Sequence, residues 1–168
     1  ENSIGSPLVK WYNRYPDPHQ LKLKEKISAI KGIAPEHILL GNGSDEAIDI
    51  LFRAFCEPGR DNVIVCPPTY GMYEVSARIN NIAVKKVQMT TNFQLNLEGL
   101  EEAIDPNTKI IWLCSPNNPS GNALYREDIE MVLNNFDGIV VIDEAYINFS
   151  RQRSFIPDLI DYPNLVIL

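Results

Sequence analysis

The sequence predicts an α/β protein with a mainly parallel sheet and helices on both faces. Strand-like and helix-like stretches alternate along most of the 168 residues, which is typical of βαβ units. Two strand-sized runs, residues 109–114 and 138–142, are almost wholly apolar, as expected of buried strands. Glycine and proline separate the stretches, as they do between the elements of a compact domain.

The first part of the chain is predicted to be an arm followed by two helices. Residues 1–20 are rich in Pro, Asn and aromatic side chains and are assigned to an N-terminal arm with turns. Apolar spacing predicts a helix over 21–30 that Gly32 ends. After a turn at Gly41-Asn42-Gly43, one apolar face that includes Ile48, Leu51 and Phe52 predicts a helix over 44–55. Ser44 or Asp45 is expected to cap this helix.

The remaining elements follow in alternation. Strands are predicted at 62–66, 83–89, 109–114, 138–142 and 164–168, and helices at 71–79, 97–104 and 126–136. Residues 115–121 form a loop, and no linker or internal repeat is found. The chain stops inside an apparent buried strand, so we expect the sequence to be a truncated piece of a longer protein.

Composition excludes several classes of function. Fifteen Lys and Arg against 22 Asp and Glu give a net charge of −7, which argues against general nucleic-acid binding. No apolar run approaches the roughly 18 residues that span a bilayer, and the first residues do not have the pattern expected of a signal peptide. The three cysteines form no C-x-x-C pair and there are two histidines, so we expect reduced thiols, a cytoplasmic location and no metal site.

Four unusual segments fall where predicted strands end, which is where open α/β sheets bind ligands. The segments are 41–46 (GNGSDE), 67–73 (PPTYGMY), 115–121 (SPNNPSG) and 143–146 (DEAY). The first could bind a phosphate at a helix start or be only a well-capped helix. It lacks the Gly-Lys-Ser/Thr of a P-loop. If phosphate binds, Asp45 should contribute its N–H, with its carboxylate turned to cap the helix.

The next two segments supply an aromatic ring and amides. Tyr70 could stack on a planar ligand ring or simply pack on the sheet rim. Asn117 and Asn118 lie between prolines that fix the loop, and a rigid amide can donate to a ligand oxygen. Ordinary turn chemistry explains the same residues equally well.

Asp143 is the most informative residue. A carboxylate at the end of a buried strand costs desolvation unless it meets a cation or hydrogen-bond donors. One possible cation is Mg²⁺ on a nucleotide, because four apolar residues followed by Asp143-Glu144 resemble a Walker B segment. The other is a protonated heterocyclic nitrogen. The missing P-loop counts against the nucleotide.

Taken together and in order, these motifs resemble the fold type I aminotransferases that use pyridoxal 5′-phosphate (PLP), and within them the histidinol-phosphate group. The shared motifs are 13–18 (NRYPDP), 41–46, 68–73, 115–121 and 143–146. The resemblance covers essentially the whole chain. It implies that residues 21–168 are a partial PLP-binding large domain whose C-terminal part and small domain are absent.

The resemblance also implies roles for matching residues. Asp143 would pair with the pyridine nitrogen of the cofactor and keep it protonated. Asn118 and Tyr146 would donate to the phenolic oxygen of the ring, and Tyr70 would stack on it. The remaining roles are phosphate binding by Ser44 and Asp45, a contact of Tyr15 with a phosphate in the neighbouring subunit of a homodimer, and a substrate contact by Glu1-Asn2.

The implied reaction transfers an amino group between L-histidinol phosphate and 2-oxoglutarate, giving imidazole-acetol phosphate and glutamate in histidine biosynthesis. The Schiff-base lysine of the family would lie beyond Leu168, so no catalytic residue is assigned here and the 168-residue chain alone is expected to be inactive. Open alternatives are an aminotransferase for aromatic or other amino acids, a PLP β-lyase or decarboxylase, a Mg-nucleotide-binding module, and an α/β domain that binds nothing.

Overall fold

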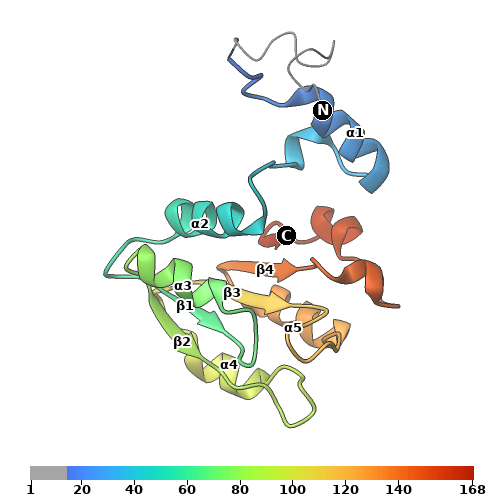
Figure 1. The fold of residues 1–168 in the computed structure, drawn as a ribbon. Helices are drawn as coiled ribbons and strands as arrows, with labels where there is room; N and C mark the ends of the chain where they lie inside the picture. The colour runs from blue at the N-terminus through green and yellow to red at the C-terminus, as the bar shows by residue number, and fades with distance from the viewer. Residues whose placement is uncertain (1–14) are drawn as a thin grey trace, which may run out of the picture. The chain divides into compact units, whose positions relative to one another are not determined.

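A computed structural model describes residues 15–168 of the chain, which divides into two compact units at Leu40 and Gly41. The second unit is built on a five-stranded parallel sheet in the order β2-β1-β3-β4-β5 (Figure 1). The strands are β1 (Asn62–Val65), β2 (Ala83–Lys86), β3 (Thr108–Cys114), β4 (Ile139–Asp143) and β5 (Leu165–Ile167). The predicted fold class is confirmed.

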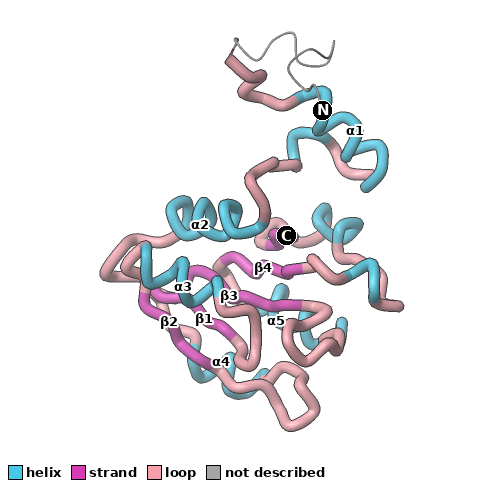
Figure 2. Tube along the Cα trace, viewed as in Figure 1, coloured by secondary structure: helices cyan, strands magenta, loops and turns pink. Residues whose placement is uncertain are grey.

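Helices precede the first strand and connect β1 to β4 in turn, as Figure 2 shows by colour. They are α1 (Leu21–Lys31), α2 (Ser44–Phe55), α3 (Met72–Ile79), α4 (Leu97–Ala103) and α5 (Arg126–Asn135). Three short 3₁₀ segments, η2 (Pro35–His37), η3 (Ile147–Phe149) and η4 (Ile156–Ile160), were not predicted from the sequence.

The sheet is covered on both faces, and each face has its own apolar core. On one face α2 and α3 pack against alternate strand residues such as Val63, Trp112 and Val141. On the other face, α4 and α5 pack against the intervening strand residues, such as Ile111 and Ile142. Each fully buried aliphatic side chain stabilises the fold by about 1.5–3 kcal/mol, so the sandwich of layers holds the strand ends in place.

The strand order reverses between β1 and β3. The helix that follows β1, α3, lies on one face, whereas the helix that follows β3, α5, lies on the other. The loops that leave these neighbouring strands therefore diverge at their carboxyl ends, which is the arrangement that forms ligand crevices in α/β sheets.

Two local predictions were wrong. Neither Ser44 nor Asp45 caps α2: Gly43 occupies the N-cap with φ +80° and no side-chain cap bond is present. The strand predicted at 83–89 ends at Lys86, because β1 runs into Pro67-Pro68, which have no N–H groups to continue the ladder. Two backbone hydrogen bonds, from the N–H of Val87 to the carbonyl of Val65 and from the N–H of Met89 to the carbonyl of Pro67, keep residues 87–89 beside the end of β1.

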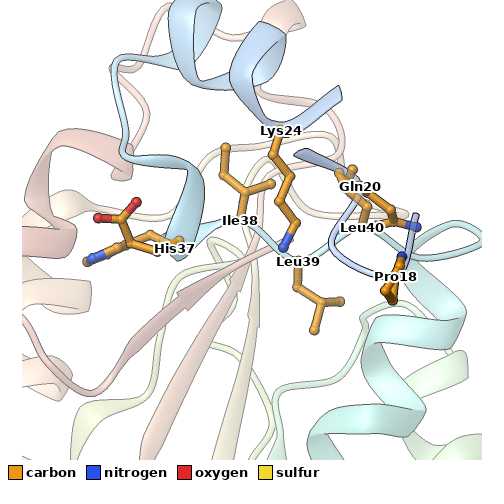
Figure 3. Close-up of a pocket in the computed structure, with 8 residues that line it drawn as sticks. Pro18, Gln20, Lys24, His37, Ile38, Leu39 and Leu40 are labelled. Atoms are coloured by element: carbon orange, nitrogen blue, oxygen red, sulfur yellow. The ribbon is translucent and has the colours of Figure 1, made fainter. Parts of the chain in front are cut away.

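The first unit contains α1 and η2. Gly32 ends α1 in the left-handed region (φ +71°), as predicted. A pocket within this unit lies between the start of α1 and the extended segment after η2 (Figure 3). Its lining residues are Pro18, Gln20, Lys24, Glu36, His37, Ile38, Leu39 and Leu40. None of the predicted site residues lines it.

Cys56, Cys66 and Cys114 are free and buried. Burial raises the pKa of the Cys56 thiol to about 11 and that of Cys66 to about 12, so both are protonated thiols of low reactivity at neutral pH. No helix among residues 15–168 is long and apolar enough to cross a membrane.

Asp105 joins three strands at the amino-terminal edge of the sheet. Its carboxylate accepts from Lys85 Nζ of β2 at 2.7 Å, from Asn62 Nδ2 of β1 at 3.0 Å and from the N–H of Asn107 at 2.8 Å. The hydrogen bond from Lys85, followed by that from Asn62, holds the pKa of Asp105 well below its usual range. The ionised carboxylate thus fastens the strand starts to one another.

We expect this carboxylate to give the fold an acid-sensitive contribution to stability. Because its pKa is lower in the folded than in the unfolded chain, the contribution is complete above about pH 4 and is lost progressively as the pH falls below that value. Urea unfolding of the protein and of Asp105→Asn between pH 3 and pH 7 measures it. The difference in free energy of unfolding between the unaltered protein and Asp105→Asn should become smaller as the pH falls. Asp137→Asn, at an exposed carboxylate, is the control, and a difference that is constant with pH would contradict the expectation.

Candidate functional site

The predicted ligand-binding segments of the second unit gather at the carboxyl edge of the sheet. The loops after β1 and β3 supply Tyr70 and Asn118, β4 ends at Asp143, and α2 begins at Ser44. The backbone N–H of Ser115 donates to the carbonyl of Asp143 at 3.0 Å, which joins the ends of β3 and β4. The strand-end argument made from the sequence is therefore right for the segments after β1, β3 and β4. It is wrong for 41–46, which follows no strand because residues 38–40 pair with no other strand.

Asp143 lies buried at the centre of this edge, with 4% of its surface exposed. Its Oδ2 accepts from the hydroxyl of Tyr73 at 2.7 Å, and its Oδ1 accepts from the N–H of Ala145 at 3.0 Å. Within residues 15–168 it makes no ion pair. The expected cationic partner is thus not a side chain of the described residues, and two neutral donors hold a buried carboxylate that still favours a cation.

Asp143 and Glu144 serve opposite faces of the sheet. Successive strand residues alternate in direction, so Asp143 lies on the face of α2 and α3. The carboxylate of Glu144 instead accepts from the N–H of Phe155 at 2.7 Å and from the hydroxyl of Ser154, in the segment before η4. Glu144 therefore anchors a loop, and the pair does not form one acidic site as the Walker B alternative requires. Among the described residues no three His, Cys, Asp or Glu side chains are placed to hold a metal ion.

Tyr73 is the partner of Asp143 that sequence reasoning missed. It is fully buried on α3, and its ring stacks on Trp112 of β3 with centroids 4.9 Å apart and an interplanar angle of 14°. Burial raises the pKa of Tyr73 far above its ordinary value, and Cys114 and Asp143 raise it further. The phenol is therefore a neutral donor. A signal existed in the sequence, because a tyrosine on the apolar face of a predicted helix needs a partner for its hydroxyl.

Tyr70 connects the loop after β1 to the start of α2. Its hydroxyl donates to Oδ1 of Asp45 at 3.2 Å, and its ring meets Tyr73 edge-on at 5.5 Å. Burial raises the pKa of Tyr70 most, followed by the hydrogen bond and charge of Asp45, then Asp143 and Tyr146. The structure thus brings these tyrosines and carboxylates together. The expectation that the Asp45 carboxylate caps α2 was wrong, because the carboxylate turns to Tyr70 instead.

The two asparagines of the 115–121 loop have different surroundings. Asn117 is buried, and its Nδ2 donates to the carbonyl of Pro68 at 2.8 Å and to Ser120 Oγ at 2.6 Å. This amide ties the loop after β3 to the loop after β1. Asn118 is half-buried and its side chain makes no hydrogen bond to the described residues, so its amide remains free to meet a ligand.

The start of α2 offers backbone donors at the same edge. Ser44 and Asp45 are its first two residues and both are exposed. No side chain caps them, so their N–H groups are available to an anion at the positive end of the helix dipole. The carboxylate of Glu46 turns back to the N–H of Asn42, which closes the preceding turn rather than entering the site.

The remaining predicted residues belong to the N-terminal arm of the sequence. Tyr15 is fully exposed and belongs to the first unit, so its expected contact with a neighbouring subunit stays a prediction. Glu1-Asn2 falls outside the described residues.

Comparison with known proteins decides the family. A family model described as aminotransferase class I and II matches residues 10–168. The chain belongs to this aminotransferase family. A histidinol-phosphate aminotransferase from Christiangramia forsetii is 57% identical over 162 residues, which are 96% of this chain and 46% of that protein.

Solved structures agree with this family. The histidinol-phosphate aminotransferase from Clostridium acetobutylicum superposes with a TM-score of 0.77 and 26% identity, over 92% of this chain and 46% of that one. The L-threonine-O-3-phosphate decarboxylase from Porphyromonas gingivalis gives 0.76 and 27% identity, over 92% and 47%. The chain spans about half the length of the curated relatives it matches. The motif-based resemblance is confirmed, and with it membership in a family of enzymes.

The carboxyl edge fits the PLP that the family uses. A buried carboxylate without a cationic partner suits a protonated ring nitrogen, an uncapped helix start suits a phosphate, and a free half-buried amide suits the phenolic oxygen. These three features occur in one compact unit: Asp143 ends β4, Asn118 lies in the loop after β3, and the start of α2 contacts Tyr70 of the loop after β1.

Proposed function

We propose that the whole protein is a PLP-dependent histidinol-phosphate aminotransferase. It transfers the amino group of L-histidinol phosphate to 2-oxoglutarate, giving imidazole-acetol phosphate and glutamate in histidine biosynthesis. The observation that carries the substrate is the 51–57% identity, over 94–100% of this chain, to curated relatives of that name. We further propose that it acts in the cytoplasm as a homodimer.

The site residues have distinct tasks in this proposal. PLP, when bound, supplies an electron-accepting ring that stabilises charge developing at the substrate carbon. Asp143 holds the ring nitrogen and keeps its proton there. Asn118 and Tyr146 donate to the phenolic oxygen, and Tyr70 covers the face of the ring. The N–H groups of Ser44 and Asp45 bind the phosphate, and Tyr15 serves the phosphate of the neighbouring subunit.

No lysine of this chain is assigned to the Schiff base. Lys85 is held by Asp105 at the opposite edge of the sheet, Lys86 pairs with Glu74 at 2.8 Å, and Lys109 donates to the carbonyl of Pro106. Since the chain spans 46% of the relative from Christiangramia forsetii, we propose that the half of the protein not spanned here supplies that lysine.

Incubating the full-length protein with PLP, L-histidinol phosphate and 2-oxoglutarate should produce glutamate, measured with a glutamate dehydrogenase coupled assay. The 168-residue chain alone should produce none, because a base for the proton shift is lacking. Omission of histidinol phosphate is the control for background transamination. Absence of glutamate from the full-length protein with PLP bound would contradict the proposed substrate pair, and turnover by the chain alone would contradict the assignment of the lysine.

A decarboxylase of the same fold is the second candidate, and the likeness to the Porphyromonas gingivalis enzyme favours it. Release of CO₂ from L-threonine O-3-phosphate without use of a 2-oxo acid would distinguish it. An aminotransferase acting on aromatic amino acids would be revealed by glutamate formation from phenylalanine or tyrosine.

A further inference from the structure

We propose that Tyr73 is a positioning residue for the cofactor site: its phenol fixes the carboxylate of Asp143 in the orientation that meets the ring nitrogen. This inference rests on the proposed function, because it concerns the group that Asp143 is proposed to hold. The structure provides three independent supports.

The first support is how the carboxylate is held. Tyr73 and the N–H of Ala145 bond different oxygens of Asp143, at 2.7 and 3.0 Å. Two donors on separate oxygens define the plane of a carboxylate, whereas the backbone donor alone leaves it free to rotate about its side-chain bonds. Each carboxylate oxygen has two lone-pair sites, so the hydrogen bond from Tyr73 does not consume the capacity to bind a cation.

The second support is the immobility of the phenol. Tyr73 is fully buried, it stacks on Trp112, and Trp112 in turn packs on Phe52 of α2 with centroids 5.3 Å apart. Interiors are close-packed, so a ring fixed on a neighbouring ring has one available position. Tyr73 on α3, supported by Trp112 on β3, therefore places its hydroxyl at the end of β4.

The third support is the register of the sheet. Cys114 pairs with Asp143 and Trp112 pairs with Val141 in the parallel ladder. Period-two alternation therefore puts Trp112, Cys114 and Asp143 on the face that α3 covers. Burial raises the pKa of Tyr73, so its hydroxyl is protonated at neutral pH and can donate to the carboxylate.

A double-mutant cycle on the full-length protein tests the proposal, with Tyr73→Phe, Asp143→Asn and the double variant. Tyr73→Phe keeps the ring and its stacking and removes only the donor. The first readout is the PLP dissociation constant of each apoprotein, measured by fluorescence titration. We expect Tyr73→Phe alone to weaken PLP binding about tenfold, the effect of one hydrogen bond to a charged group, and to change it little in the Asp143→Asn background.

The second readout is the ¹⁵N chemical shift of the ring nitrogen in labelled PLP bound to each variant. Loss of the donor lets the carboxylate rotate away from the orientation that meets the ring nitrogen, so the resonance should move toward the unprotonated position in Tyr73→Phe. Tyr162→Phe, at a partly buried tyrosine of the opposite face, is the matched control and should leave both readouts unchanged.

The outcomes separate this inference from the proposed function. Equal losses of PLP affinity in both backgrounds would make Tyr73 merely structural and overturn the inference. Unchanged affinity and an unchanged ¹⁵N shift in Tyr73→Phe would overturn it as well, while leaving the proposed function intact. Failure of the unaltered protein to bind PLP would overturn the proposed function itself.

Discussion

Replacing Asp143 with Ala is expected to abolish PLP retention by the full-length protein. Breaking a buried charge pair by removing one partner costs about 3–5 kcal/mol, which corresponds to a loss of affinity of at least about 100-fold. The carboxylate is 4% exposed and residues 15–168 offer it no cation, so the ring nitrogen of the cofactor would supply the cationic partner that these residues lack. Absorbance of the protein after gel filtration measures retained PLP.

The same carboxylate is expected to have a different effect on the stability of the apoprotein from its effect on PLP binding. Without cofactor, residues 15–168 hold the buried carboxylate of Asp143 with neutral donors, and removing a buried carboxylate that has no cation is not expected to destabilise the fold. Asp143→Asn, which keeps the volume and an acceptor for Tyr73, should therefore unfold in urea at the same concentration as the unaltered apoprotein or at a higher one. PLP retention by Asp143→Ala equal to that of the control Asp137→Ala would contradict the assigned role.

Replacing Trp112 with Ala is expected to destabilise the protein by about 3–5 kcal/mol, the usual cost of removing a large buried aromatic side chain. The ring lies between Phe52 and Tyr73, at 5.3 and 4.9 Å, so the cavity would open beneath both covering helices. Urea unfolding monitored by circular dichroism measures the change.

Trp112→Phe is the matched comparison. The indole Nε1 is buried without a hydrogen-bond partner among residues 15–168, so no such bond is lost. Phe fills most of the space of the ring, and the cost should therefore be well below that of Trp112→Ala. Destabilisation of similar size in both variants would show that the ring contributes through something other than its volume.

The limits of local reasoning are visible in α2 and its neighbours. Both ends of α2 match the predicted range of 44–55, because apolar spacing and the flanking turn define a helix within a short window. The capping prediction failed at the same place. The direction of the Asp45 carboxylate depends on Tyr70, 25 residues away in sequence, and no local pattern contains that contact.

The sequence by itself determined the order of the elements, the parallel sheet and the placement of Asp143 at a strand end, because hydrophobic periodicity and punctuation are local and strand polarity follows from alternation. Motif order also led to the correct family. Only the tertiary structure decided which side chain meets Asp143, that Glu144 faces the other layer, and that Asn117 joins two loops. These contacts join residues up to 70 positions apart, and their partners are chosen by how helices and strands pack rather than by any pattern within one element.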